Sequence, residues 1–328
     1  MPRGRPKKNS EIPLAEEAET LAEQGSVEAK EGTVLPEDNK KRDKLAAVMR
    51  LVNTNVKGAS MDYGSTIPIR ARGSFGHPSI DKRTGGGFPY GLHSCFWGSK
   101  SCGKTTLTLD IIATAQAVGK TCVLINGERS FDAEYAKKRG VNVEQLAVLD
   151  VEKLEDGLDI IIKLCREKAA DLIVLDSIHG LAPKAELYEG KAEKEKSTAD
   201  SNMALRARAM TQYFEMVTPF ISSAQCAVIL IGQSRMDLSG FVKLETLTGG
   251  HALVHNCRLI MRLRRGQGAD APTEKVKTGK FNDKGKEIIE TVKTGFDLVI
   301  RIDKSQLKGC VEGTEMHVPF IYETGIDD

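Results

Sequence analysis

The chain contains the stretch FWGSKSCGKTTLTLDI at residues 96–111, where Gly98 is followed by four residues and then by Gly103, Lys104 and Thr105. This spacing is typical of a loop whose backbone N–H groups surround the phosphates of a nucleotide. In such a loop Lys104 supplies a charge for the β- and γ-phosphates, and the hydroxyl of Thr105 reaches Mg²⁺. The stretch therefore predicts a site for ATP and Mg²⁺. Its predicted nucleotide-binding residues are Gly98, Ser99, Lys100, Ser101, Cys102, Gly103, Lys104, Thr105 and Thr106.

The residues on either side supply the structural context that such a loop requires. LHSCFW, directly before the loop, has the composition of a strand. Leu107, Ile111, Ala115 and Val118 recur at helical spacing after the loop, and Gly119 follows as a stop. A strand, a loop and a helix in this order place the phosphates at a helix N-terminus. A chance glycine-rich turn does not explain this arrangement.

Strands and helices continue to alternate downstream. TCVLIN, LAVLD and DLIVLDS predict buried strands, and VEKLEDGLDIIIKLCREKAA predicts an amphipathic helix between the last two. DLIVLDS brings Asp176 to the carboxyl end of its strand, where it is expected to complete the Mg²⁺ site with Thr105. The alternative is that Asp176 only caps a helix, in which case it would have no relation to the phosphate loop. The alternation predicts an α/β fold with a mostly parallel central sheet.

Composition restricts the class of protein. A chain of 328 residues with 40% hydrophobic residues is long enough for one large domain with appendages, and its net charge of +2 points to no particular partner. Seven cysteines without a C-x-x-C pair indicate neither a zinc site nor a disulfide framework. No apolar run approaches the length of a membrane span or of a signal region. These features predict a protein of the reducing cytoplasm, without a membrane partner.

Three regions differ in composition. Residues 1–42 are rich in Glu, Lys, Ala and Pro, which predicts a disordered charged tail. Within it, Arg3-Gly4-Arg5-Pro6 resembles an AT-hook that enters the minor groove, and a solubilising basic tail is the alternative. Residues 43–75 begin with the amphipathic segment DKLAAVMRLV and are expected to form a small helix and strand element. Residues 76–328 are expected to form the core.

Six segments, in this order, resemble the RecA family of recombinases, which includes bacteriophage members of the UvsX type. They are GSKSCGKTTLTLDIIATAQAVGKTC, INGERSFDAEYAKKRGV, DLIVLDSIHGLAPKAE, MALRARAM, VILIGQSRM and LTGGHAL. The resemblance covers residues 43–328 and implies a RecA-like P-loop ATPase core. It also implies that residues 43–75 dock on a neighbouring subunit. Because the sequence ends with VPFIYETGIDD, we expect the C-terminal domain of bacterial members to be absent.

The family pattern assigns roles around the nucleotide. Glu128 matches the carboxylate that orients and deprotonates the attacking water, and Gln233 matches the glutamine that senses the γ-phosphate. Asp132 and Tyr135 match residues that contact the adenine, Tyr135 by stacking. The alternatives are a surface charge for Glu128 and a core aromatic for Tyr135.

The resemblance also implies a contribution from the next subunit. Phosphoryl transfer often uses an additional cation, which the family supplies from a pair of basic residues in a late strand. FDLVIRIDKSQLKG offers Arg301 and Lys304 in that region, although the pair is one residue further apart than in the family and begins with Arg. Lys308 fits the pattern poorly.

Two long polar segments, 188–202 and 234–250, each follow a core strand. Loops of this length inside a compact domain are usually functional or disordered, and the resemblance implies that they bind DNA along a filament axis. The first departs from the family in length and mixed charge. Contacts to phosphates and a stacked aromatic would bind DNA without reading its sequence. The DNA-binding residues implied are Arg206, Arg208, Arg235, Phe241, Lys243, Gly249 and Gly250.

Taken as a whole, the resemblance implies a DNA-dependent ATPase that forms helical filaments on single-stranded DNA and promotes homologous pairing and strand exchange in DNA recombination and repair. Single- and double-stranded DNA, further copies of the chain, and mediator or single-strand-binding proteins are the implied partners. The cytoplasm, or the host cytoplasm for a phage protein, is the implied location. The alternatives are a regulatory paralogue without strand exchange and a RecA-fold ATPase or kinase acting on protein. The charged segment 264–296 receives no role.

Overall fold

The chain forms two compact units, Met1–Ile69 and Arg70–Asp328. A computed structural model describes residues 36–56, 60–65, 70–189, 194–195, 203–237, 244–247, 251–266, 271–281 and 287–328. Most of the predicted tail, with the segment Arg3-Gly4-Arg5-Pro6, lies outside the described residues. The boundary between the units falls at Ile69, a few residues before the predicted start of the core.

Helix α2 (Pro36–Asn55) is the described helix of the first unit. It contains the helix predicted from DKLAAVMRLV but begins at Pro36, inside the predicted tail, because a proline followed by acidic residues is a favoured helix start. In the last turn of the helix, the Asn53 side chain accepts a hydrogen bond from the Met61 N–H at 2.7 Å and donates one to the Met61 carbonyl at 3.1 Å. The strand expected within residues 43–75 is β1 (Arg72–Gly73), which belongs to the second unit.

The second unit is built around one ten-stranded sheet. Its parallel strands, in spatial order, are β11 (Cys257–Arg265), β3 (His93–Gly98), β9 (Ala227–Asp237), β6 (Leu172–Asp176), β4 (Cys122–Asn126) and β5 (Leu146–Leu149). The sheet continues beyond β11 with the antiparallel strands β14 (Gly295–Ser305), β15 (Glu315–Ile321) and β16 (Gly325–Ile326), and β10 (Leu244–Leu247) pairs with β9. The predicted α/β fold with a mostly parallel sheet is confirmed.

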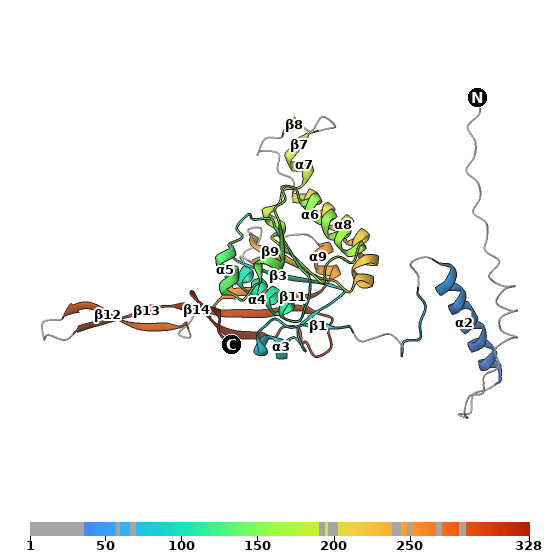
Figure 1. The fold of residues 1–328 in the computed structure, drawn as a ribbon, viewed down its shortest axis with the longest axis horizontal. Coiled ribbons are helices and arrows are strands. Elements are labelled where there is room, and N and C mark those ends of the chain that lie inside the picture. Colours follow the sequence, from blue (N-terminus) through green and yellow to red (C-terminus); the bar gives the residue numbers. More distant parts are fainter. Residues whose placement is uncertain are drawn as a thin grey trace. The chain divides into compact units, whose positions relative to one another are not determined.

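Helices cover both faces of this sheet (Figure 1). They are α3 (Pro78–Arg83), α4 (Lys104–Ala117), α5 (Ala133–Lys138), α6 (Leu154–Arg166), α8 (Met203–Ala224) and α9 (His251–Asn256), with short 3-10 turns η1 (Val143–Gln145) and η2 (Ile178–Gly180). The short helix α7 (Lys184–Leu187), which has no buried residue, lies away from the sheet beside β7. The side chains of β6 alternate between the two faces of the sheet. Leu172 and Val174 face the core that contains α4, whereas Ile173 and Leu175 face the core that contains α6 and α8. A strand buried on both faces is apolar throughout, as its sequence predicts.

Two short hairpins lie outside the main sheet. β7 (Tyr188–Glu189) pairs with β8 (Lys194–Glu195) inside the first predicted DNA-binding loop, so the four described residues of this loop are paired as strands. β12 (Thr273–Phe281) pairs with β13 (Glu287–Lys293) to form an arm that projects from the core (Figure 1). The arm accounts for most of the charged segment 264–296. β1 pairs with β2 (Phe88–Pro89). Within the described part of the chain, no helix has the length and apolar character needed to cross a membrane.

Candidate nucleotide-binding site

The phosphate loop joins β3 to α4 with the geometry that its glycines allow. Gly98 has φ 155° and Gly103 has φ 91°, and a Cβ at Gly98 would lie 1.9 Å from the carbonyl oxygen of Leu263. Only glycine fits at both positions. Ser101, at the crest, also adopts a positive φ of 55°. Since α4 begins at Lys104, the loop presents a helix N-terminus, whose N–H groups lack intrahelical partners and attract anions.

Lys104 lies inside the loop, as predicted. Its ammonium donates to the carbonyl oxygens of Gly98 at 3.1 Å and Ser99 at 2.5 Å, and its side chain is only 8% exposed. The Cys102 sulfur lies 3.7 Å away. Burial raises the pKa of the Cys102 thiol, against the opposing effect of Lys104. The thiol is therefore protonated at neutral pH and acts as a small packing residue.

Thr105 and Asp176 meet as the sequence predicts. The Thr105 hydroxyl donates to a carboxylate oxygen of Asp176 at 2.8 Å. Burial raises the pKa of Asp176 to about 6, with a further contribution from Glu128, while the Thr105 hydrogen bond and Lys104 act in the opposite direction. A buried carboxylate beside a hydroxyl is an oxygen donor set that suits Mg²⁺, whose charge would favour the ionised form. The described residues contain no cluster of three or more His, Cys, Asp or Glu that could hold a metal without a substrate.

Glu128 follows β4 and connects two neighbouring strand ends. One carboxylate oxygen accepts hydrogen bonds from the Ser177 hydroxyl at 2.6 Å and from the Gln233 amide at 2.5 Å. The backbone N–H of Gln233 donates to His179 at 3.1 Å. The turn itself is fixed because the N–H of Glu128 donates to the carbonyl oxygen of Asp176 at 3.2 Å. Glu128 and Gln233, far apart in sequence, are thus in direct contact.

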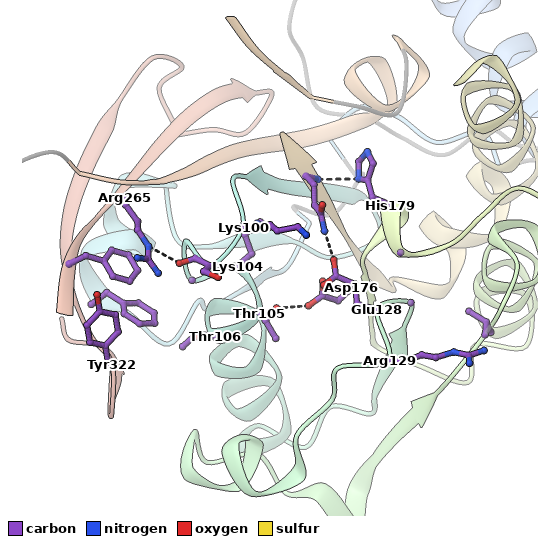
Figure 2. A pocket seen from close by; sticks show the side chains of 18 of the residues that line it. Lys100, Lys104, Thr105, Thr106, Glu128, Arg129, Asp176, His179, Arg265 and Tyr322 are labelled. Carbon is purple, nitrogen blue, oxygen red and sulfur yellow. Dashed lines mark hydrogen bonds between the residues drawn. The ribbon is translucent and has the colours of Figure 1, made fainter. Parts of the chain in front are cut away.

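These residues line one cavity of about 1040 Å³ at the carboxyl edge of the parallel strands (Figure 2). One end of it, called the phosphate end below, is formed by Lys104, Thr105, Glu128, Asp176 and Gln233. A volume of this size accommodates a nucleotide, since small-molecule sites typically occupy about 300–1,000 Å³.

Asp132 and Tyr135 lie on the α5 side and do not line the cavity themselves. Asp132 caps α5 by accepting a hydrogen bond from the Tyr135 N–H at 3.0 Å. The Tyr135 hydroxyl contacts the Thr106 hydroxyl at 2.9 Å, and Thr106 does line the cavity. One turn further along both helices, the Arg139 guanidinium is 2.5 Å from a carboxylate oxygen of Asp110. These two contacts hold α5 against α4.

The opposite end of the cavity is formed by residues that the sequence did not single out, and it is called the aromatic end below. Phe296 and Phe320 stack with centroids 4.5 Å apart and an angle of 19°, and Tyr322 lies 6.1 Å from Phe296. Arg265 lies over the Phe296 ring at 4.5 Å, and its Nε donates to the carbonyl oxygen of Ser101 at 2.9 Å. Figure 2 shows Arg265 and Tyr322 on the far side of the phosphate loop from Asp176.

Arg301 and Lys304 do not line this cavity. On β14, Arg301 forms an ion pair with Asp303 at 3.5 Å. The Lys304 ammonium donates to the carbonyl oxygens of Val254 at 2.6 Å and His255 at 3.0 Å, at the C-terminal end of α9. Partial burial lowers the pKa of Lys304. The side chains of Arg301 and Lys304 are therefore not part of the phosphate end of their own chain.

The predicted DNA-binding residues differ in where the structure places them. Arg206 on α8 is only 9% exposed and donates to the carbonyl oxygen of Leu181 at 3.0 Å, so its guanidinium packs into the protein, in contrast to the expected phosphate contact. Arg208 is exposed on the same helix. The backbone of Arg235 lies in β9, without a described side chain. The remaining predicted positions, Phe241, Lys243, Gly249 and Gly250, lie outside the described residues.

Comparison with known proteins identifies relatives for most of the chain. A family model described as the RecA N-terminal domain matches residues 44–295. Protein RecA of Marinobacter nauticus is 39% identical over 235 residues, which cover 70% of this chain and 65% of that protein. Protein RecA of Pseudomonas fluorescens strain SBW25 and that of Pseudomonas syringae pv. syringae are each 40% identical over 235 residues, covering 70% of this chain and 64% of theirs. The chain thus spans slightly less than two thirds of the length of these relatives.

Proposed function

The chain belongs to the RecA family, and from this premise we propose that it is an ATP-dependent recombinase that assembles on single-stranded DNA and promotes homologous pairing and strand exchange. The observation that carries the proposal is the meeting of the phosphate loop, Asp176, Glu128 and Gln233 at one edge of the sheet. A nucleotide-binding protein needs only the loop and Asp176. The contact between Glu128 and Gln233 adds a means to connect the γ-phosphate position with the strand β9 and the segment that follows it.

Each residue of the phosphate end has a separate task in this proposal. Lys104 and the N-terminus of α4 bind the phosphates, and Thr105 with Asp176 holds Mg²⁺. The ion, when bound, neutralises charge on the β- and γ-phosphates. Glu128 orients the attacking water and accepts its proton, which is the role of a general base within hydrogen-bond reach. Its present partners, Ser177 and Gln233, hold the carboxylate at this position.

Gln233 connects hydrolysis with DNA binding in the proposal. Its side chain contacts Glu128, and its backbone is part of β9, whose last residues, 234–237, belong to the predicted second DNA-binding segment at 234–250. A γ-phosphate that draws the Gln233 amide away from Glu128 would shift the end of β9. ATP binding would then favour the DNA-bound arrangement, and hydrolysis would release it.

Arg301 and Lys304 are proposed to act on the ATP of a neighbouring subunit. Support comes from their position outside the cavity of their own chain. Among the described residues that form the phosphate end, Lys104 is the one cation. A cation supplied in trans makes hydrolysis depend on assembly. In a filament with ATP between subunits, nucleotide binding would also close the interface.

DNA is proposed to bind mainly through its phosphates. Arg208 is exposed on α8, whereas Arg206 packs inside, so Arg208 is the residue of this pair that carries the proposal. Affinity for single-stranded oligonucleotides should then fall steeply with salt and depend little on sequence. Arg208→Gln should reduce the slope of log affinity against log salt by about one. A flat slope in the wild-type protein contradicts phosphate binding.

One experiment separates this function from its alternatives. ATP hydrolysis is measured with and without single-stranded DNA, and the same samples with a non-hydrolysable ATP analogue are viewed by negative-stain microscopy. A recombinase shows DNA-stimulated hydrolysis together with helical filaments. A regulatory paralogue, or an ATPase or kinase acting on protein, lacks at least one of these. Strand exchange between a circular single strand and a linear duplex then tests the activity itself.

A further inference from the structure

Arg265 is the last residue of β11, and its guanidinium reaches the phosphate loop of the same chain. Its Nε donates to the carbonyl oxygen of Ser101 at 2.9 Å, and its guanidinium carbon lies 4.5 Å from the centroid of the Phe296 ring. Ser101 has a φ of 55°, in the left-handed region that residues other than glycine rarely adopt. The contact thus falls on the loop residue whose backbone conformation is least favourable on its own.

We propose that Arg265 is a positioning residue that holds the phosphate loop in its nucleotide-binding conformation, acting through Ser101 and supported by Phe296. The inference rests on the proposed function, because it concerns the same nucleotide site. When a loop spends part of its time in other conformations, the apparent Kd equals the intrinsic Kd divided by the fraction of molecules whose loop is in the binding conformation. The Arg265 bond raises that fraction. Once nucleotide is bound, its phosphates order the loop, so turnover at saturation does not depend on Arg265.

The support for Arg265 comes from the base of the β12–β13 arm. Arg265 precedes the β12–β13 arm in sequence and Phe296 follows it, so the two residues that contact each other lie on either side of the arm. At the base, the Gly266 N–H donates to the carbonyl oxygen of Asp297 at 2.7 Å, which fixes the strand ends side by side. A Cβ at Gly295 would lie 1.8 Å from the carbonyl oxygen of Phe320. This close packing fixes the ring on which Arg265 rests.

The test is Arg265→Gln in the full-length protein without DNA, titrated with an ATP analogue that carries a fluorescent ribose substituent. Kd is expected to rise about fivefold, the loss expected for one hydrogen bond and one exposed cation–π contact. The kcat of ATP hydrolysis with single-stranded DNA is expected to stay within about twofold, while KM rises with Kd. If Arg265 served only the stability of the fold, Arg265→Gln would lower the melting temperature without raising KM at an unchanged kcat.

Two variants separate positioning from charge. Arg264→Gln removes the same charge from the neighbouring residue, whose guanidinium lies 3.3 Å from Glu315, and should leave Kd unchanged. Arg265→Lys keeps the charge but lacks the planar group and the Nε donor, and should bind as weakly as Arg265→Gln. Because it retains a long side chain with a charged end, it also supplies the measurement if Arg265→Gln fails to fold.

Phe296→Leu tests the support. It should weaken binding by itself, and the double variant with Arg265→Gln should bind no more weakly than Arg265→Gln alone. The proposal is overturned by wild-type affinity in Arg265→Gln, by an equal loss in Arg264→Gln, by recovery in Arg265→Lys, or by additive losses in the double variant. Lys104→Ala distinguishes the two levels. If it binds normally, the nucleotide site itself is wrong, whereas if it loses binding while Arg265→Gln retains it, only the role of Arg265 is wrong.

Discussion

The phosphate end and the aromatic end of the cavity are built by different rules. At the phosphate end, Lys104, Thr105 and Asp176 come from the ends of parallel strands and from the helix that follows one of them, and each makes a polar contact to another member of the set or to the loop. At the aromatic end, Phe296 and Phe320 come from antiparallel strands and stack on each other. The phosphate end therefore presents charged and hydrogen-bonding groups, and the aromatic end presents an apolar ring surface.

This difference predicts how substitutions act. The phosphate end holds groups aimed at a charge that changes during the reaction, so losses there should appear in turnover. The aromatic end offers contacts that are the same before and during the reaction, so losses there should appear in affinity alone. Substitutions at each end test this division.

Lys104→Ala should give the largest effect. It removes the buried ammonium at the phosphate loop, and ATP hydrolysis should fall by about 10³-fold or more, with nucleotide binding weakened as well. Phosphate release from the purified protein measures it. Lys100→Ala is the matched control, since Lys100 lines the same cavity and carries the same charge. Similar losses in both variants would show that overall charge, and not the position of Lys104, sustains the reaction.

Glu128→Gln should separate hydrolysis from binding. The amide keeps the size of the side chain but cannot accept the proton of the attacking water, so hydrolysis should fall by about 10²-fold or more. Nucleotide affinity should stay close to that of the wild type, and assemblies on single-stranded DNA should persist after dilution into competitor DNA. Glu152→Gln, at another carboxylate of the same cavity, is the control. Normal hydrolysis in Glu128→Gln removes this residue from the mechanism.

Asp176 should make the phosphate end sensitive to pH. Its pKa is raised from 3.8 to about 6, so the ionised carboxylate destabilises the nucleotide-free fold above pH 6, and this effect is absent below the unfolded pKa of 3.8. Asp176→Asn should therefore raise the free energy of unfolding by about 2 kcal/mol at pH 8, and leave it unchanged near pH 3.

The same variant should weaken Mg²⁺-dependent nucleotide binding at pH 8, because the ion needs the ionised carboxylate. In the wild-type protein this binding should weaken as the pH falls below 6. Asp176→Asn should lose the part of this pH dependence that comes from the carboxylate and keep the part that comes from the nucleotide phosphate. Chemical denaturation and nucleotide titration at several pH values measure the two quantities. Stability that is equal in both proteins at pH 8 contradicts the raised pKa.

The sequence predicted that Lys104, Thr105 and Asp176 lie close together, for a physical reason. Gly98, Gly103, Lys104 and Thr105 lie within one short motif, and Asp176 ends an apolar strand, so local spacing together with the geometry of parallel sheets brings them together. The alternation of strands and helices gave the α/β architecture in the same way. The helix α2 was predicted, but its start at Pro36 was not, because propensity alone defines helix ends poorly.

The aromatic end escaped prediction because no short-range pattern marks it. Arg265 and Phe296 are separated by the whole β12–β13 arm, and only the antiparallel pairing of β11 with β14 brings them together. The inward position of Arg206 was missed for a related reason. Its spacing on α8 gives no sign of the carbonyl of Leu181, which arrives from another part of the chain. Tertiary contacts of this kind decide side-chain roles without a local signal.

The smallest effect is expected from removing the arm while keeping its base. Replacing residues 274–292 with an Asn-Gly turn leaves Thr273 paired with Lys293, since a two-residue turn of this type closes a hairpin. The Thr294 N–H still donates to the carbonyl of Pro272 at 3.0 Å, and the Tyr322 N–H to that of Thr294 at 2.9 Å. Because these bonds hold the aromatic end in place, nucleotide affinity should change by less than about twofold.

Gly295→Ala provides the contrast at the base itself. The added methyl group meets the carbonyl oxygen of Phe320 and must displace the backbone that carries Phe296 and Tyr322. The Kd of Gly295→Ala for nucleotide should therefore rise more than that of the protein with the shortened arm. This is expected although Gly295→Ala adds one methyl group and the shortened protein lacks the whole arm. Titration of both proteins with the same fluorescent ATP analogue compares them directly. Shortening the arm could instead weaken nucleotide binding as much as Gly295→Ala does. In that case the arm itself contributes to the site, and the base of the arm is not sufficient to hold the aromatic end in place.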